Sequence, residues 1–168
     1  MREKYKQSKT ASKQKKNTKI TFDVLQNIVP CRLNDGTTLN ALHKFSKQFK
    51  RMVGKSLPKA YLNFLADQDG YADDYAMFFG STTCIAVDDH RFPIIQGLIE
   101  MNMLHPVDSS VLLGSLCGQW LAYEHHRNTY VILNQKTFKV YERQYPDFET
   151  LLSSVSQIVF LFWQRNQQ

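Results

Sequence analysis

The amino-acid sequence predicts an α+β domain: an antiparallel sheet with a meander in the second half of the chain, flanked by two N-terminal helices and a closing C-terminal helix. Apolar residues recur at helical spacing before residue 69 and again after residue 146, and short runs of β-branched and aromatic residues lie between them. Strands gathered in this way favour a layered α+β domain over an alternating parallel sheet. We expect the helices to cover one side of the sheet.

The chain divides into a basic tail and one domain. Residues 1–19 hold eight Lys and Arg against one Glu, a net charge of +7 in a chain whose total is +6. This tail is expected to be disordered, because it has too few apolar residues to offset the entropy of ordering. Residues 20–168 are long enough for a single core.

Targeting signals and disulfide patterns are also absent from the sequence. It contains no apolar run of the length that a signal peptide or a membrane helix needs, so we expect a cytoplasmic protein without a membrane span. Cys31, Cys84 and Cys117 are odd in number and widely spaced, which favours reduced, buried thiols over a disulfide framework.

The first half of the domain contains the two long helices. A short helix or strand at 22–29, stopped by proline, and a turn at 34–36 precede them. The first long helix is predicted over 38–53, with Gly54 ending it. The second is predicted over 57–68, with Ser56 as its cap and Gly70 as its left-handed stop. Its buried face should hold four residues: Leu57, Tyr61, Phe64 and Leu65.

The second half should supply most of the sheet. Strands are expected at 82–87, 111–113, 119–124, 129–133 and 137–142, with a helix at 93–104. The loops at 124–128 and 134–136 have hairpin length, so the last three strands should form an antiparallel meander. Gly114 and Gly118 are interpreted as a turn or bulge before it. The final helix, 147–163, should bury an apolar face of Phe148, Leu151, Leu152, Val155, Ile158, Val159 and Phe162.

The residue types that carry catalysis do not form a recognisable pattern. None of the five histidines stands at a spacing that would place two metal ligands on one face. The segment 114–118 has leucine where an acyl-transfer nucleophile would stand, and no phosphate loop or dinucleotide fingerprint is present. We therefore expect a protein that is not an enzyme and that holds no cofactor or metal.

Two charge clusters remain as candidate binding residues. The basic cluster consists of Lys44, Lys47, Lys50, Arg51, Lys55 and Lys59. The acidic cluster consists of Asp67, Asp69, Asp73, Asp74, Asp88 and Asp89. Tyr71 and Tyr75 interleave with the aspartates and could be aromatic anchors for a partner or parts of the core. Both clusters could be ordinary solvated faces, or together they could form a bipolar surface that steers a charged partner.

The order of the motifs resembles the SUKH superfamily (Smi/Knr-like proteins). The segment 56–70 is similar to its entry signature of Leu-Pro, an aromatic, Phe-Leu and an acidic residue before glycine. The segments that follow in the family's order are 112–115, 118–124, 129–133, 138–141 and 147–152. The similarity spans residues 37–163. The superfamily includes bacterial toxin-immunity proteins, fungal Smi/Knr cell-wall regulators, the bacterial Syd protein and a herpesviral group.

The resemblance implies a non-enzymatic immunity protein that binds and neutralises a cognate toxin, and the acidic cluster would then contact a basic toxin. Two other functions stay open. The tail and the 44–59 face could neutralise the phosphates of a nucleic acid. A Syd-like regulator associated with membranes or secretion is the third, with the Lys-rich tail drawn to anionic lipid.

Overall fold

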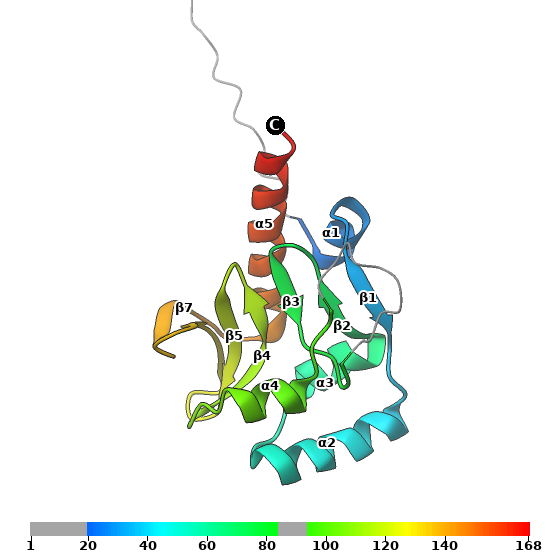
Figure 1. Ribbon diagram of the computed structural model, residues 1–168, viewed down its shortest axis with the longest axis vertical. Helices are drawn as coiled ribbons and strands as arrows, with labels where there is room; N and C mark the ends of the chain where they lie inside the picture. The colour runs from blue at the N-terminus through cyan, green and yellow to red at the C-terminus, as the bar shows by residue number, and fades with distance from the viewer. Residues whose placement is uncertain (1–19, 84–93) are drawn as a thin grey trace, which may run out of the picture.

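A computed structural model describes residues 20–83 and 94–168, which form one antiparallel sheet surrounded by helices (Figure 1). The basic tail, Cys84, Asp88 and Asp89 lie outside the described residues. The strands are β1 (Arg32–Asp35), β2 (Gln68–Ala72), β3 (Ala76–Phe78), β4 (Ser110–Leu116), β5 (Gln119–Glu124), β6 (Thr129–Asn134) and β7 (Val140–Tyr145). The helices are α1 (Phe22–Ile28), α2 (Leu39–Val53), α3 (Lys59–Asp67), α4 (Leu98–Leu104) and α5 (Phe148–Asn166). The α+β class predicted from the sequence is confirmed.

The seven strands lie in the sheet in chain order, and every neighbouring pair is antiparallel. The expected meander of the last three strands is confirmed and extends through the whole sheet. A bulge between Leu112 and Gly114 interrupts the pairing of β4 with β5, and Gly118 lies in the turn that joins them. Both glycines therefore have the roles expected for them.

Several expected boundaries in the sheet are wrong, for a different reason in each case. The turn expected at 34–36 begins inside β1, where Asn34 donates a hydrogen bond to the carbonyl of Asp69. β7 begins at Val140 instead of 137. The side chain of Asn134 accepts hydrogen bonds from the backbone N–H groups of 136 and 137, and these bonds keep both residues in the turn between β6 and β7. Thr82 and Thr83 are not in a strand, and the rest of the segment expected at 82–87 lies outside the described residues.

The helix ends show which capping signals decide the structure. α2 begins after Thr38, whose side chain accepts from the backbone N–H of Ala41, and it ends at a left-handed Gly54 (φ 79°). α3 is shorter than predicted: Pro58 is its N-cap, so Ser56 does not cap it. It ends at Asp67 because the following residues pair as β2.

Gly70 adopts the left-handed conformation expected of it, but inside β2 instead of at a helix end (φ 102°). A Cβ at this position would lie 2.5 Å from the Cγ2 atom of Ile95, so the strand can approach that side chain only with glycine here.

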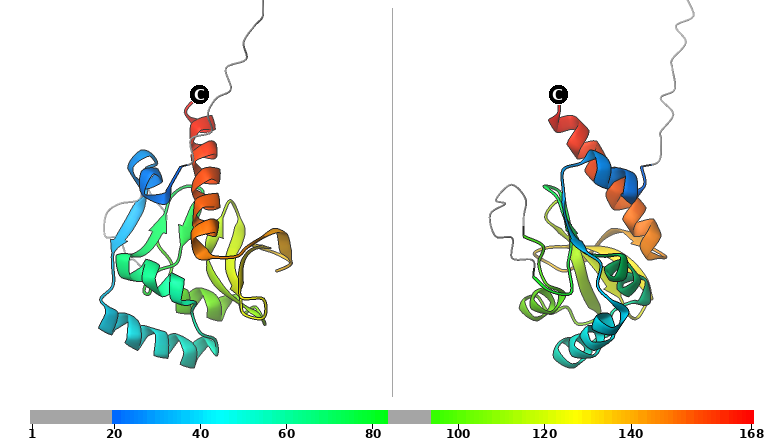
Figure 2. Two further views of the ribbon diagram at one scale, coloured as in Figure 1. Left: turned by 180° about the vertical axis from the view of Figure 1, so that it is seen from behind. Right: turned by 90° about the vertical axis from the view of Figure 1, so that its right-hand side faces the viewer.

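The helices cover both faces of the sheet, not one as expected (Figure 2). α1, α3 and α5 lie on one face, α4 lies on the other, and α2 runs along one end of the molecule. The helix expected at 93–104 starts only at Leu98, because 96 and 98 exchange backbone hydrogen bonds with Gly80. Asn102 then fastens α4 to β4: its side chain donates to the Leu112 carbonyl and accepts from the Leu112 N–H, at 2.9 and 2.8 Å.

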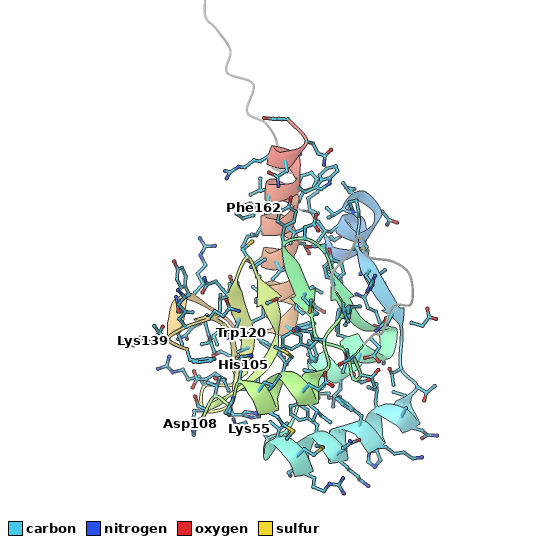
Figure 3. The ribbon with its side chains drawn as sticks, viewed as in Figure 1. Lys55, His105, Asp108, Trp120, Lys139 and Phe162 are labelled. Carbon is cyan, nitrogen blue, oxygen red and sulfur yellow. The ribbon has the colours of Figure 1, made fainter. Side chains whose placement is uncertain are left out.

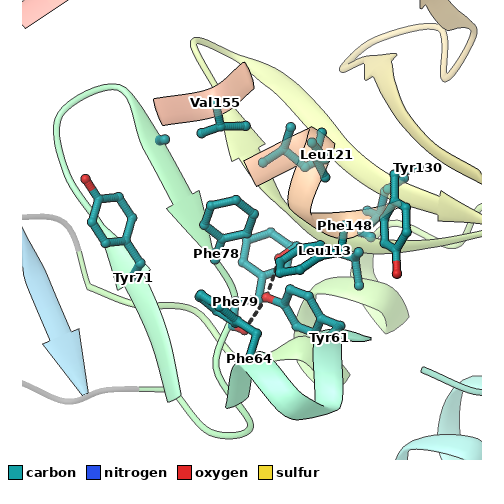
Figure 4. Close-up of a cluster of buried hydrophobic side chains, with 14 of the residues drawn as sticks. Tyr61, Phe64, Tyr71, Phe78, Phe79, Leu113, Leu121, Tyr130, Phe148 and Val155 are labelled. Atoms are coloured by element: carbon teal, nitrogen blue, oxygen red, sulfur yellow. Dashed lines mark hydrogen bonds between the residues drawn. The ribbon is translucent and has the colours of Figure 1, made fainter. Parts of the chain in front are cut away.

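The core on the α3 and α5 face is a cluster of aromatic rings (Figure 4). The hydroxyl of Tyr61 donates to the carbonyl oxygens of Phe79 and Leu113, at 2.7 and 2.8 Å. The stripe predicted for the second helix is confirmed, since Leu57, Tyr61, Phe64 and Leu65 are all buried. The stripe predicted for α5 is confirmed in its first half, but Phe162 is 39% exposed because the end of this helix extends past the core.

Candidate functional site

The structure separates the aspartates that the sequence groups together. Asp69 and Asp73 are buried, whereas Asp67 and Asp74 are exposed. Asp69 accepts hydrogen bonds from the backbone N–H and the hydroxyl of Ser81, both at 2.6 Å. The expectation that Asp69 and Asp73 contact a partner is therefore wrong, because the fold already engages both carboxylates internally.

Asp73 holds the corner between β2 and β3. Its Oδ1 accepts from the backbone N–H groups of Tyr75 and Ala76 at 2.6 and 2.7 Å, and its Oδ2 accepts from the hydroxyl of Tyr71. Burial raises the pKa of Asp73 above its usual value, although the three hydrogen bonds act in the opposite direction. Burial, followed by the charge of Asp73, also raises the pKa of Tyr71 far above its usual value.

The two tyrosines of the acidic segment belong to the core and its edge. Tyr71 is fully buried and its ring lies 4.9 Å from that of Phe22. Tyr75 is half-buried and stacks on Phe162 at 5.8 Å, and its hydroxyl accepts a hydrogen bond from Asn166. Of the two alternatives left open by the sequence, the core role holds for Tyr71.

Asp67 lies in a groove that the sequence did not reveal. Together with Asp147 and Glu149 at the beginning of α5, it lines a hollow of about 420 Å³ whose apolar lining is Phe64, Phe148 and Leu152. An adjoining hollow of about 240 Å³ shares Ala60, Asp147 and Phe148 with it. The smaller hollow is completed by Pro58, Lys59, Tyr123, Asn128, Tyr130 and Pro146. We call the two together the α3–α5 groove.

A ladder of aromatic rings forms the floor of the α3–α5 groove. Tyr123 and Tyr130 are 5.1 Å apart between ring centroids, Tyr130 and Phe148 are 5.6 Å apart, and Phe148 and Phe64 are 5.5 Å apart. The ladder brings together strand residues near 123–130 and helix residues near 64 and 148. Phe64, Tyr130 and Phe148 are only 8%, 5% and 5% exposed and Tyr123 is half-buried, so a small part of each of the first three rings borders the groove and Tyr123 is its most accessible ring.

The charges of the groove are distributed unevenly along it. Asp147 caps α5 by accepting from the backbone N–H of Thr150 at 2.7 Å, and the hydrogen bonds from Thr150 lower the pKa of this carboxyl. Lys59 and Asp67 stand at opposite ends of α3, roughly 12 Å apart at the rise of an α-helix. The end of the groove near Asp67 is therefore the acidic end.

The basic cluster falls mostly on the outer face of α2. Its four helical members, Lys44, Lys47, Lys50 and Arg51, are all exposed. At 100° per residue they occupy about 120° of the helix circumference, opposite the buried face of Leu42, Phe45 and Phe49. We call this surface the α2 stripe. Lys59 belongs instead to the α3–α5 groove.

Lys55 has a third environment, at the C-terminal end of α2 (Figure 3). It donates a hydrogen bond to the carbonyl of Val107 and lines a hollow of about 310 Å³ with Asp108, His125 and His126. Partial burial, and then the charges of Lys55 and His126, lower the pKa of His125. This hollow combines groups of both signs.

Metal ligation and membrane insertion have no support in the described residues. Within 20–83 and 94–168, no three or more His, Cys, Asp or Glu side chains are placed to hold a metal ion. None of the helices in this part of the chain has the length and apolarity to cross a bilayer. Cys31 and Cys117 are free thiols, but Cys31 is only partly buried and Cys117 is exposed, so the expectation of a buried thiol is wrong for Cys117.

Comparison of the chain with models of known protein families gave no match, and a search of curated proteins gave none either.

Among the described members of the predicted acidic cluster, only Asp67 lies in the α3–α5 groove. Asp147 was recognisable in the sequence as the start of the last helix, but nothing local indicated that it would lie beside Asp67. Tyr123 and Tyr130 flank a hairpin whose length was visible, and their register across it (Tyr123 opposite Tyr130) places both rings on the groove side.

Proposed function

We propose that this protein is a non-enzymatic binding module that seats a basic segment of a partner protein in the α3–α5 groove. The observation that carries the proposal is the meeting of three carboxylates, Asp67, Asp147 and Glu149, beside a floor of aromatic rings. The aliphatic stem of a lysine or arginine can pack on such a floor while its charged end reaches the carboxylates.

The resemblance to the SUKH superfamily implies which kind of protein the partner is. In that reading the protein is a cytoplasmic immunity protein and the basic segment belongs to a cognate toxin domain. A toxin that cleaves nucleic acid needs a basic surface to hold phosphates. Carboxylates in the groove would compete for that surface, and their field would accelerate the encounter.

The experiment is a charge reversal in the groove, the double variant Asp67→Lys/Glu149→Lys. The partner that the resemblance implies is a toxin domain encoded by a neighbouring gene, and association with it is measured at two ionic strengths. We expect the association rate to fall at least tenfold at low salt, with a weaker salt dependence than the wild type. The matched control is Asp35→Lys/Asp74→Lys, which changes the same charge at exposed positions outside the groove. Equal effects of the two double variants would contradict the assignment of the groove.

The α2 stripe supports a second candidate function, binding of nucleic acid phosphates. Four exposed cations lie on one helix face, and the sequence from 41 to 66 contains no Asp or Glu that could neutralise them. We expect binding of a single-stranded oligonucleotide to weaken steeply with salt and to weaken further in Lys44→Gln/Lys47→Gln/Arg51→Gln. Deleting residues 1–19 separates the tail from the stripe: affinity that vanishes with the tail would exclude the stripe as the site.

A further inference from the structure

A fourth hollow lies between the sheet and the C-terminal half of α5. It has a volume of about 410 Å³, and we call it the α5 pocket. Its lining residues Ile158 and Phe162 stand 10 and 14 residues after Phe148 of the α3–α5 groove, which places them roughly 15–20 Å farther along the helix. The two sites share no lining residue, so the α5 pocket is a separate feature.

Apolar side chains supply most of the wall of the α5 pocket. They come from three strands and the helix: Leu116, Ile132, Tyr141, Tyr145, Ile158 and Phe162. Tyr141 is 54% exposed and Phe162 is 39% exposed, so the described part of the chain leaves a large apolar surface uncovered at the mouth. Figure 3 shows Phe162 on the upper half of α5. A volume above 300 Å³ with apolar walls is typical of small-molecule sites.

The α5 pocket also contains two polar groups that have no partner in the described residues. Arg143 is its only charged lining residue, and it makes no ion pair within 20–83 and 94–168. The Oε1 atom of Gln119 is buried, and no donor in this part of the chain reaches it. A buried acceptor is normally satisfied, so Gln119 calls for a donor from outside the described residues, which a bound ligand can supply. Arg143 is exposed, and its guanidinium can pair with an anion that enters the pocket.

These two groups are separated by the apolar part of the pocket. Gln119 lies on β5, Arg143 lies on β7, and Ile132 lies on β6 between them. Two strand spacings amount to roughly 10 Å. A complementary ligand therefore has an anionic group at one end, an apolar body, and a hydrogen-bond donor toward the other end.

We propose that the α5 pocket binds a linear, medium-chain acyl carboxylate that carries a hydroxyl group far from its carboxylate. The carboxylate pairs with Arg143, the chain covers Ile132, Ile158 and Phe162, and the hydroxyl donates to Oε1 of Gln119. This ligand site goes beyond the proposed partner-binding function and does not depend on it.

The test compares three probes by isothermal titration calorimetry on the full chain, below the concentrations at which they aggregate: 10-hydroxydecanoate, decanoate and 1,10-decanediol. We expect 10-hydroxydecanoate to bind tightest, with a loss of at least fivefold for each probe that lacks one polar end. Gln119→Leu should remove the preference for the hydroxy acid over decanoate. Arg143→Gln should remove its preference over the diol.

Two further variants decide whether the α5 pocket itself is the site. Ile158→Trp fills the pocket and should lower affinity for every probe at least tenfold, whereas Arg127→Gln in the exposed turn between β5 and β6 should leave the affinities unchanged. Circular dichroism checks each fold. If Ile158→Trp does not fold, the exposed Arg143→Gln variant carries the test alone. No saturable binding of 10-hydroxydecanoate at millimolar concentration, or binding that Arg143→Gln leaves unchanged, would overturn the proposal.

Discussion

Two sets of carboxylates in this protein differ in burial: one set is hydrogen-bonded inside the fold, and the other is exposed to solvent. Asp69 and Asp73 are buried, Asp69 near the start of β2 and Asp73 at the corner between β2 and β3, and each accepts at least two hydrogen bonds. Asp67 and Glu149 are exposed at the rim of the α3–α5 groove. The difference teaches that a run of aspartates in a sequence is not one electrostatic surface.

The comparison has a physical basis in desolvation. A buried carboxylate is tolerated when donors replace the water that it loses, so the backbone around it becomes committed to that arrangement. An exposed carboxylate keeps its water and remains available to a partner. Asp147 lies between these cases, because it caps α5 and also lines the groove.

The largest expected effect is at the buried corner. Asp73→Ala should lower the free energy of unfolding by about 2–3 kcal/mol, because it leaves the N–H groups of Tyr75 and Ala76 and the hydroxyl of Tyr71 without their acceptor. Urea unfolding followed by circular dichroism measures this loss. A change as small as that for an exposed aspartate would abolish the distinction between the two sets.

Asp147→Ala should have an intermediate effect on stability. Loss of the N-cap hydrogen bond to Thr150 should lower the free energy of unfolding by about 1 kcal/mol. The variant should also bind the partner more weakly, because it removes one of three groove carboxylates. Asp147→Ser separates the two roles, since serine can cap the helix without a charge. Full binding by Asp147→Ser would show that this carboxylate is structural only.

Asp73→Asn should affect stability less than Asp73→Ala, and the effect should depend on pH. Because burial raises the pKa of Asp73 from its ordinary 3.8, the fold favours the protonated carboxyl. The contribution of this group to stability is therefore fully present below pH 3.8 and is lost as the pH rises through the folded-state pKa. Urea unfolding between about pH 3 and 7 should show the wild type losing stability relative to Asp73→Asn as the pH rises. The opposite trend would mean that the hydrogen bonds outweigh burial.

The smallest expected effect on stability is at the groove rim. Asp67→Lys/Glu149→Lys should change the free energy of unfolding by less than about 0.5 kcal/mol per site, because both side chains are exposed. Thermal unfolding of this variant, run beside the binding experiment, measures the difference. A large loss of stability would show that the rim carboxylates, like Asp73, are needed by the fold.

The strands differ in how well the sequence predicted them. β5 was predicted at its observed bounds, and β6 to within one residue, because alternation and hairpin-length loops are local signals. β2 was missed: its residues, Gln68 to Ala72, have low strand propensity and are held by β1 and β3 on either side. The same pairing ends α3 early and places Gly70 in a strand.

By itself, the sequence determined the α+β class, helix α2 with its stop at Gly54, the start of α5 next to Asp147, and the buried stripe of α3. These depend on neighbours a few residues apart, where periodicity and capping chemistry act. Only the tertiary structure decided which aspartates are buried and placed Asp67 beside Asp147 and Glu149. It also left Gln119 and Arg143 in one apolar pocket. Those outcomes depend on contacts between segments tens of residues apart, and no local pattern encodes the desolvation and pairing that such contacts bring.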